Sequence, residues 1–329
     1  MHTVSVARQA MATRFEIVLH GENPVSLRAA GEEALDEIER IEARLSLYRS
    51  SSEIAHVNAR AAREAVRVSP ATFRLLEQAA RLTTETEGAF DITIGPLMRC
   101  WGFVGAGGHV PEPAELAAAR AAVGMRWVQL DPLQFTVRFL RDGVMLDLGA
   151  IGKGHAVGVA ADILRDAGVT SALIHGGTSS IFAMGHPPGI EAWKIAIDRP
   201  PAGDGVSSQI PSPNAESGSA APDLLAVVEL CDEAFSVSAV WGKSFQADKK
   251  TMGHVIDPRT GEPAGRAILA AVALPAATET DAFSTALLTL GSNGVDILMR
   301  ARPRARLLVA ETNGSDVAVR AQGIEVIAR

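Results

Sequence analysis

The sequence has few of the residues that build metal-rich or disulfide-stabilised domains. Among its 329 residues there are only two cysteines, Cys100 and Cys231, and they lie far apart in the chain. Neither belongs to a Cys-x-x-Cys pair, which excludes a zinc ribbon, an iron–sulfur cluster and a thioredoxin-like centre. Aromatic residues make up only 5% of the chain, with a single tyrosine, Tyr48.

The chain also lacks an excess of positive charge and any long apolar run. Lys and Arg number 31 against 38 Asp and Glu, which gives a net charge of −7 at pH 7. A protein that binds bulk nucleic acid or anionic membrane needs a basic face, so both classes are disfavoured. No segment approaches the roughly 18 consecutive apolar residues of a membrane span, and the first residues do not resemble a signal peptide. The sequence as written therefore predicts a cytoplasmic protein.

The chain has the composition of an ordinary globular protein, with 47% hydrophobic and 21% charged residues, and it is long enough to bury a large core. Apolar residues at helical spacing predict a helix over 27–45, and Ser69-Pro70 begins a second helix that ends near Gly88. Further helices are expected near 113–124, 154–167, 280–290 and 293–300. Strands are expected at 171–175, 193–197, 224–230, 269–274 and 306–310, with a hairpin over 136–148.

Hairpins and helices alternate without a steady βαβ rhythm, which favours an α+β fold in which antiparallel β-sheets are packed against helices. Residues 200–222 are rich in Pro, Gly, Ser and Ala and contain hardly any large apolar side chains. This composition predicts a flexible surface insertion. We therefore expect one domain over 1–329, interrupted by that insertion.

A glycine-rich segment, Leu146-Asp147-Leu-Gly-Ala150-Ile-Gly-Lys153-Gly154, lies between a predicted strand and a predicted helix. Glycines let the backbone approach a ligand, and the N–H groups at a helix start favour an anion. Lys153 adds a full positive charge, although the spacing is not that of a P-loop. A plain glycine-rich turn with an exposed lysine explains the segment equally well.

Asp281, Ser284 and Thr285 lie at helical spacing, so they share one side of a helix. An all-oxygen group of this kind suits Mg²⁺ or Ca²⁺ rather than zinc. In the alternative interpretation, Thr280 is the helix N-cap and Asp281 interacts with the helix dipole as a first-turn acid. Such an acid contributes only about 0.3–1 kcal/mol. Taken alone, the segment favours the capping interpretation.

His254 comes just before Asp257-Pro-Arg-Thr-Gly261, a strong turn signal that would hold the histidine on a rigid element. A histidine with a pKa near neutrality can take a proton from a hydroxyl group. A lone histidine is nevertheless more often structural, and that interpretation stays open here.

The stretch Gly88-Ala89-Phe90-Asp91 leads through a chain reversal to Trp101 and Phe103. A carboxylate beside ring faces could hold a flat heterocycle. Core packing combined with a turn explains the two rings equally well.

Together, and in this order, these segments resemble the FAD:protein FMN transferases of the ApbE type. The resemblance covers nearly the whole chain from about residue 10. It also includes Met11-Ala-Thr-Arg-Phe15, Tyr48 to Asn58, Phe90-Asp91-Ile-Thr-Ile-Gly-Pro96-Leu97 and His175-Gly-Gly177.

The resemblance implies an α+β fold of T-fold-related architecture and a defined reaction. Such enzymes bind FAD and a divalent cation, usually Mg²⁺, and transfer the FMN phosphoryl group to a hydroxyl of an acceptor protein, releasing AMP. The acceptor carries a Thr or Ser in a flavinylation motif. Because a pyrophosphate carries about two negative charges and the chain is net negative, Lys153 and the metal would supply the local cations that binding needs.

The resemblance also assigns roles to individual residues. His254 would take the proton of the acceptor hydroxyl. The metal would lie between Asp281, Ser284, Thr285 and the backbone carbonyl of Ala150. The flavin and its phosphates would contact Met11, Tyr48, Ala89, Phe90, Asp91, Asp147, Lys153 and Ile256.

The sequence departs from the family pattern at several positions. The usual Lys-Gly-Tyr-Ala-Val-Asp is Lys153-Gly-His155-Ala-Val-Gly158, which lacks the carboxylate. Gly-Gly-Asp becomes Gly176-Gly-Thr178, and Thr-Ser-Gly becomes Val237-Ser238-Ala239. These departures bear on acceptor recognition and on the efficiency of transfer. They leave two alternatives open, namely a FAD pyrophosphatase that yields FMN and AMP and a non-catalytic flavin-binding protein.

Overall fold

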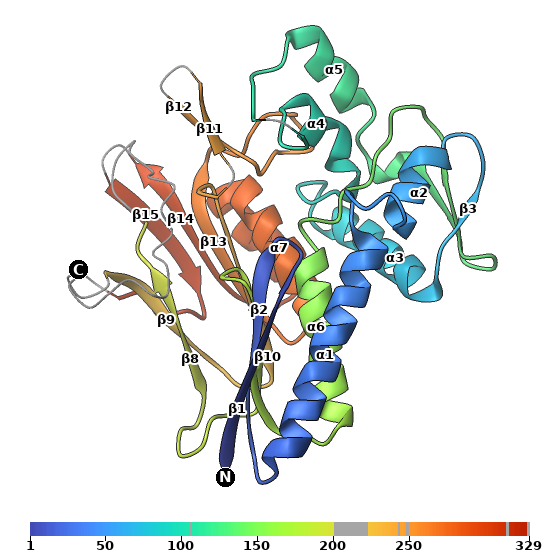
Figure 1. The fold of residues 1–329 in the computed structure, drawn as a ribbon. Coiled ribbons are helices and arrows are strands. Elements are labelled where there is room, and N and C mark those ends of the chain that lie inside the picture. Colours follow the sequence, from blue (N-terminus) through green and yellow to red (C-terminus); the bar gives the residue numbers. More distant parts are fainter. Residues whose placement is uncertain (106, 201–222, 243, 248–249, 314–315, 328–329) are drawn as a thin grey trace.

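An antiparallel sheet of eight strands forms the centre of the molecule, in the order β1-β2-β6-β7-β10-β13-β14-β15 (Figure 1). The computed structural model describes residues 1–105, 107–200, 223–242, 244–247, 250–313 and 316–327. The strands of this sheet are His2–Ala10, Thr13–Gly21, Ser171–Gly176, Ser180–Met184, Glu233–Ala239, Ala267–Leu274, Arg306–Asn313 and Asp316–Gln322. Since segments from both ends of the chain pair in one sheet, the fold depends on contacts between residues that are distant in sequence.

Three smaller sheets flank the central one. Strands β8 (Trp193–Asp198) and β9 (Leu224–Leu230) form one pair, and β11 (Ser244–Ala247) and β12 (Lys250–Gly253) form another. The third consists of β3 (Val66–Arg67), β5 (Thr136–Phe139) and β4 (Val128–Asp131). Every strand pair in these sheets is antiparallel, as the α+β prediction requires.

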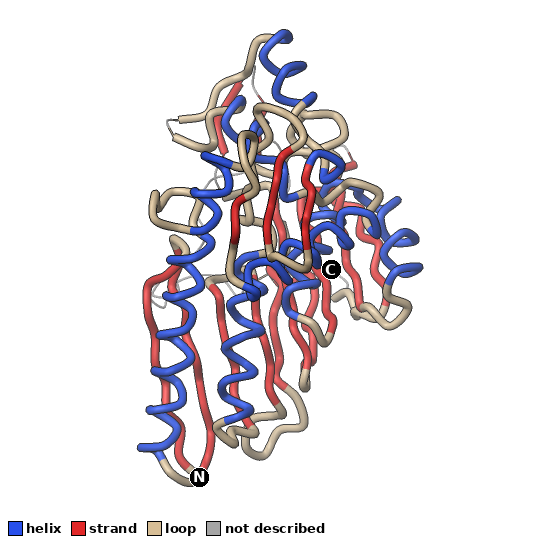
Figure 2. The backbone as a smooth tube through the Cα atoms, turned by 90° about the vertical axis from the view of Figure 1, so that its right-hand side faces the viewer, coloured by secondary structure: helices blue, strands red, loops and turns tan. Residues whose placement is uncertain are grey.

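Helices α1 (Pro24–Leu45), α6 (Gly152–Asp166) and α7 (Ala277–Leu290) lie side by side on one face of the large sheet. In Figure 2 these helices stand in front of the strands. The remaining helices are α2 (Glu53–Arg60), α3 (Pro70–Glu85), α4 (Gly95–Cys100), α5 (Pro113–Ala121) and α8 (Gly294–Ala301). None of the helices in the described part of the chain is both long and apolar enough to cross a membrane.

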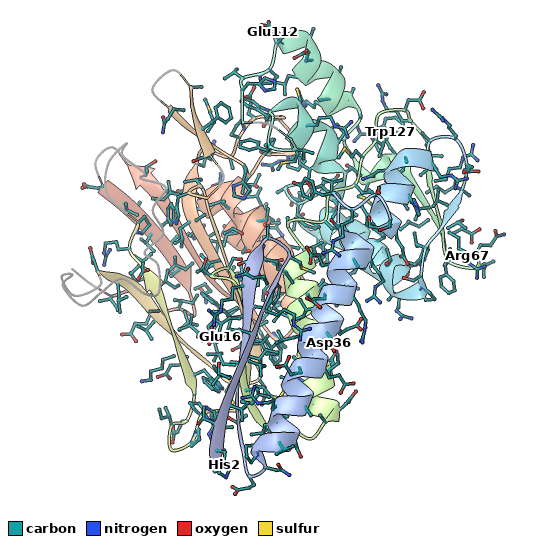
Figure 3. All side chains as sticks on the ribbon, in the orientation of Figure 1. His2, Glu16, Asp36, Arg67, Glu112 and Trp127 are labelled. Carbon is teal, nitrogen blue, oxygen red and sulfur yellow. The ribbon has the colours of Figure 1, made fainter. Side chains whose placement is uncertain are left out.

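The middle strands of the large sheet are buried on both faces. Along β13, Ala270 and Val272 belong to the core under the helices, whereas Leu269 and Ala271 belong to a second core. Trp193 of β8 belongs to that second core, so the β8–β9 pair covers the opposite face. Figure 3 shows the side chains that fill the space between sheet and helices. This double burial explains why β13 is apolar throughout, without the alternation of a half-exposed strand.

The helix signal at Ser69-Pro70 is confirmed. Ser69 is the N-cap of α3 and accepts a hydrogen bond from the backbone N–H of Thr72, with Pro70 as the first helical residue. Asn23 caps α1 in the same way, accepting from Val25 and Ser26. These side chains satisfy donors that the first turn of a helix leaves without partners.

The predicted hairpin over 136–148 is wrong. Strand β5 instead pairs with the preceding strand β4, and residues 144–148 form no strand. The side chain of Asn58 hydrogen bonds to both backbone groups of Leu146, with distances of 2.9 and 2.7 Å. The backbone N–H of Asp147 donates to the carbonyl of Ile92 at 2.7 Å. A side-chain amide therefore replaces the strand partner that the pattern of apolar residues suggested.

Helix α7 begins at Ala277, before the predicted start near Thr280. Its N-cap is Ala276, which provides no side-chain hydrogen bond, and the Thr280 hydroxyl donates to the carbonyl of Ala277 within the helix. The interpretation of Thr280 as the cap of this helix is therefore wrong. Nearly all of the predicted insertion at 200–222 lies outside the described residues.

Candidate active site

The Asp281 carboxylate lies where the start of α6 meets α7. Its Oδ2 accepts a hydrogen bond from the backbone N–H of Gly154 at 2.9 Å, and its Oδ1 accepts from the hydroxyl of Ser180 at 3.0 Å. Asp281 is only 5% exposed. Because Gly154 lies in the first turn of α6, Asp281 caps that helix from outside, and α6 has no side-chain cap of its own.

The two helices meet closely because residue 154 has no side chain. A Cβ atom at Gly154 would lie 2.3 Å from the carbonyl oxygen of Ala277 and 2.7 Å from the Cβ of Asp281. Real Cβ atoms do not approach other atoms so closely, so a larger residue would push the helices apart. Gly154 thus allows the contact that brings Asp281 to the start of α6.

The hydroxyl groups of Ser284 and Thr285 lie one turn further along α7. Both donate to the backbone carbonyl of Asp281, at 3.0 and 3.2 Å. The Oγ of Ser238 on β10 lies 2.9 Å from the Oγ of Ser284 and 3.4 Å from the Oγ1 of Thr285. Ser284 is fully buried, whereas Thr285 is partly exposed. Thr285 is therefore the more accessible of the two hydroxyls.

The donor atoms at this junction fit a hard divalent cation. They are one carboxylate and the two hydroxyls. A carboxylate offers about four lone-pair positions, and Asp281 uses two of them for Gly154 and Ser180. Mg²⁺ is commonly held in proteins by one or two carboxylates together with phosphate oxygens.

A positively charged residue precedes Gly154 in the chain. Lys153 is the residue before Gly154, in the first turn of α6, and it is partly exposed. It forms no ion pair within the part of the chain that the structure describes. Since the N–H of Gly154 already donates to Asp281, the lysine is the group at this helix start that suits an anion.

A second group of predicted site residues, around Asp91 and Asp147, lies where the 146–148 segment contacts the 89–92 segment. Asp147 is bound through its backbone to Ile92, next to the predicted residues Ala89, Phe90 and Asp91. The Tyr48 ring is 68% exposed, and partial burial together with the charge of Asp147 raises the pKa of its hydroxyl. Tyr48 and Asp147 therefore lie near one another.

Asp91 has a structural role in this group. Its Oδ1 accepts from the backbone N–H and the hydroxyl of Thr93, at 2.7 and 2.6 Å, and its Oδ2 accepts from the N–H of Met125. Burial raises the pKa of the carboxyl group, while these hydrogen bonds oppose the shift. The carboxylate thus holds the chain reversal in place, and Ala89 and Phe90 are buried beside it.

His254 follows β12 and lies beside aromatic rings. Its ring is edge-on to Phe103, with centroids 6.4 Å apart, and a Cβ at Gly242 would lie 3.3 Å from its Cε1. The predicted turn after it is confirmed, since the N–H of Gly261 donates to the carbonyl of Asp257 at 2.8 Å.

The turn that follows His254 is anchored to the neighbouring segment. Trp101 is buried and donates its Nε1–H to the carbonyl of Gly261 at 2.8 Å, so its ring serves packing. Ile256 is buried in the same small apolar cluster. Trp101 therefore attaches the turn beyond His254 to the chain reversal that carries Phe103.

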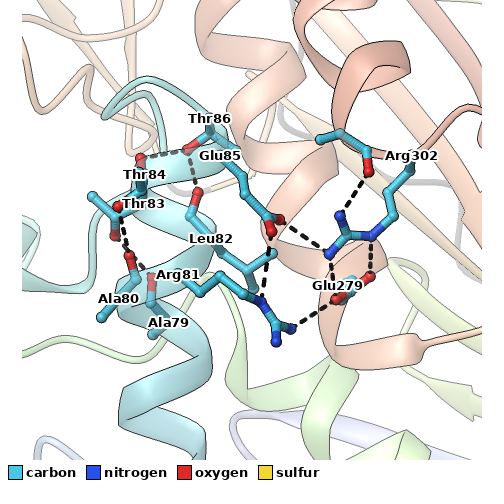
Figure 4. Close-up of polar contacts among 11 residues, drawn as sticks. Ala79, Ala80, Arg81, Leu82, Thr83, Thr84, Glu85, Thr86, Glu279 and Arg302 are labelled. Carbon is cyan, nitrogen blue, oxygen red and sulfur yellow. Dashed lines mark hydrogen bonds and ion pairs between the residues drawn. The ribbon is translucent and has the colours of Figure 1, made fainter.

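A cluster of ion pairs fixes the start of α7 to α3 and α8 (Figure 4). Glu279, two residues before Asp281, accepts from the Nε and Nη2 of Arg302, both at 2.7 Å, and from Arg81 at 3.1 Å. Glu85 lies 3.0 Å from Arg302. The hydrogen bonds to Glu279 raise the pKa of the Arg302 guanidinium. Helix α3 leads directly into the segment of Ala89 and Asp91, so this cluster connects the two groups of predicted residues.

Met11 lies in the turn of the β1–β2 hairpin. Met11 and Ala12 both have positive φ, at 50° and 58°, which suits a tight two-residue turn. The N–H of Gly177 donates to the carbonyl of Arg14 at 3.1 Å, so this end of the hairpin lies next to the segment that leads into β7.

A cavity of about 460 Å³ borders Asp257 and Arg259, near the C-terminal end of α7. Its other lining residues are Thr260, Pro263, Ala264, Gly265, Arg266, Thr289, Leu290, Asn293 and Ile297. No predicted site residue lines it, so this space is separate from the junction at Asp281.

Ser180 is a site residue that the sequence analysis missed. It begins β7, is 1% exposed, and faces the helices together with Phe182 and Met184. A signal existed in the sequence, because a small polar residue occupies a position in the Ser180-Ile-Phe-Ala-Met run where alternation predicts a buried side chain.

The fold and this junction define the ApbE-like class of α+β proteins. The crystal structure of the ApbE protein of Thermotoga maritima is 26% identical, with a TM-score of 0.83, and covers 98% of this chain and 97% of that chain. The flavin transferase ApbE of Vibrio cholerae is 25% identical, with a TM-score of 0.80 and the same coverage. The predicted fold class is confirmed.

The sequence profile of the ApbE family matches residues 11–308, and the chain belongs to this family. The FAD:protein FMN transferase of Salmonella typhimurium is 28% identical over 270 residues, which are 78% of this chain and 69% of the relative. That of Vibrio cholerae is 27% identical over 279 residues, which are 84% of this chain and 78% of the relative. The predicted resemblance is confirmed.

Proposed function

We propose that this chain is a FAD:protein FMN transferase, the activity for which its curated relatives are named. The observation that carries the proposal is the junction of α6 and α7. There, a buried carboxylate caps a glycine-rich helix start that also bears Lys153. A site with a carboxylate for a cation and a lysine for an anion suits a metal-bound pyrophosphate.

In the proposed reaction, an acceptor Thr or Ser hydroxyl attacks the phosphorus on the FMN side of FAD. A new P–O bond to the acceptor forms, the P–O bond of the pyrophosphate bridge breaks, and AMP leaves. Phosphoryl transfer of this kind depends mostly on positioning and charge neutralisation. Lys153, in the first turn of α6, holds the phosphates for it.

Mg²⁺ is the cation that the donor atoms suit, with Asp281, Thr285 and the carbonyl of Ala150 as protein ligands. When bound, it would neutralise phosphate charge. Ser284 supports this group from a buried position, since its hydroxyl bonds to the Asp281 carbonyl and lies against Ser238.

His254 takes the proton from the acceptor hydroxyl in this proposal. A general base of this kind accelerates reactions by about 10²–10⁴-fold. Phe103 and Gly242 both lie next to its ring.

We assign the flavin contacts to the residues around Tyr48, Asp91 and Asp147. Exposed Tyr48 offers a ring face, and Met11, Asp147 and Ile256 border the same region by resemblance. Both carboxylate oxygens of Asp91 already accept hydrogen bonds within the chain. Asp91, Ala89 and Phe90 would therefore contribute to flavin binding by shaping the backbone that borders it.

The test is a mixing assay with purified protein, FAD and Mg²⁺, with and without an acceptor domain that carries a flavinylation motif. We expect AMP release together with an acceptor that is heavier by one FMN. AMP release that is independent of the acceptor would instead identify a pyrophosphatase. Bound FAD without AMP would identify a flavin-binding protein.

A matched pair of variants tests His254. We expect His254→Gln to bind FAD normally and to transfer FMN slowly. His186→Gln changes an exposed histidine and should transfer at the wild-type rate. A His254→Gln protein as fast as His186→Gln would exclude His254 as the base.

A further inference from the structure

We infer that Ser180 is a positioning residue that orients the Asp281 carboxylate toward its cation. The inference rests on the proposed function, in which Asp281 is a metal ligand. It goes further because it assigns a role in metal binding to a residue of the sheet, outside the ligand set. The hydroxyl of that set, Thr285, lies on α7 itself.

Ser180 has the geometry that this role needs. Its hydroxyl donates to the Oδ1 of Asp281 at 3.0 Å, while the N–H of Gly154 donates to the Oδ2 at 2.9 Å. Each carboxylate oxygen is thus held by a donor from a different element, β7 in one case and α6 in the other. Two such bonds fix the rotation of the carboxylate and leave its remaining lone pairs in a defined direction.

Burial strengthens the hydrogen bond from Ser180 to Asp281. Ser180 is 1% exposed and Asp281 is 5% exposed, so water does not compete for either group. A hydrogen bond in such surroundings is stronger than one in water. A neutral hydroxyl also leaves the negative charge of the carboxylate available to a cation, which a paired arginine or lysine would reduce.

The same sheet supplies an internal comparison. Ser236 lies directly opposite Ser180 in the pairing of β10 with β7, is equally buried at 1%, and also donates one hydrogen bond to α7. Its acceptor is the hydroxyl of Thr280, 2.9 Å away, rather than the Asp281 carboxylate. The two serines therefore contribute alike to packing, and only Ser180 contacts the proposed ligand.

The decisive experiment compares Ser180→Ala with Ser236→Ala. Loss of a residue that orients a metal ligand typically lowers metal affinity by about 10–100-fold. We expect Ser180→Ala to raise the Mg²⁺ concentration for half-maximal AMP release by that factor, with the KM for FAD unchanged. Ser236→Ala should leave the Mg²⁺ dependence at the wild-type value. An equal shift in both variants, or none in Ser180→Ala, would overturn the positioning role.

A second readout avoids turnover. The rise of Tm with MgCl2 concentration in the absence of FAD reports Mg²⁺ affinity directly, and it should weaken in Ser180→Ala only. Ser180→Cys keeps the side-chain volume and exchanges the hydroxyl for a weak donor, so it should behave like Ser180→Ala. A wild-type Mg²⁺ response in Ser180→Cys would show that a cavity, rather than the lost bond, caused the effect, and would contradict the inference.

Asp281→Asn tests the metal assignment separately from the role of Ser180. If this variant keeps the wild-type dependence on Mg²⁺, the metal assignment itself fails. If it loses the dependence while Ser180→Ala retains it, the metal assignment stands and the role of Ser180 is refuted.

Discussion

The backbone N–H of Gly154 and the carboxylate of Asp281, 127 residues apart in the chain, are joined by a buried hydrogen bond of 2.9 Å. The bond supplies α6 with the cap that its own sequence lacks, and it places the carboxylate beside Lys153. A stabilising contact and a proposed ligand are thus the same side chain. Substitutions here should change both stability and metal dependence.

Asp281→Ala should be clearly destabilising as well as inactive. The residue is the fifth of α7 rather than a first-turn acid, and its removal leaves the Gly154 N–H and the Ser180 hydroxyl without acceptors. Each buried donor left without a partner costs about 1–3 kcal/mol. Urea unfolding measures this, with Asp162→Ala on α6 as the control, because the Asp162 side chain is 72% exposed. Equal stability of the two variants would contradict the buried bonds.

Two glycines of α6 should respond oppositely to alanine. Gly154→Ala places a methyl group against the Ala277 carbonyl and should disrupt the contact between the helices. At Gly158 the new Cβ would lie at an ordinary 3.6 Å from the Cβ of Ala277. Gly158→Ala should therefore raise the free energy of unfolding by about 0.5–1 kcal/mol. Denaturant titration of both variants would reveal the difference, and a loss of stability in Gly158→Ala would contradict this packing.

The ion-pair cluster of Figure 4 should contribute more to stability than the exposed pair of Arg300 with Glu87. Removing one partner of a fully buried pair costs about 3–5 kcal/mol. Because the Arg302 side chain is 25% exposed and Glu279 retains Arg81, Arg302→Met should cost less than this, but more than the loss of an exposed pair. Arg300→Met removes an exposed pair with Glu87, so the change should stay within about 0.5 kcal/mol. Thermal unfolding of the two methionine variants distinguishes them. Similar Tm values would mean that the cluster does not stabilise α7.

His155 should make the protein less stable in mild acid. Burial, helped by the charge of Arg44 and opposed by Glu37, lowers the pKa of His155 to about 4. Because the unfolded chain binds this proton near pH 6.5, stability falls as the pH drops from 6.5 toward 4, by on the order of 2–3 kcal/mol. His155→Tyr should flatten this part of the stability profile. His175, whose pKa burial also lowers, is present in both proteins, so the difference between them isolates His155.

The sequence by itself predicted several local features of this protein. Ser69-Pro70 marked the start of α3 because the signals of a cap lie within one turn. The helical spacing of Asp281 and Thr285 placed both on one side of α7, where the Thr285 hydroxyl reaches the Asp281 backbone. The family resemblance also followed from short motifs in a fixed order.

Tertiary structure decided what those residues contact. The strand expected at 144–148 is absent because Asn58, 88 residues away, binds the backbone of Leu146. The partner of Asp281 on β7, Ser180, lies 101 residues before it in the chain. Periodicity describes which side of an element a residue occupies, but it carries no information on which distant element will be opposite. For that reason the proposed ligand was visible in the sequence, whereas the groups that hold it in place emerged only when α6, α7 and β7 came together.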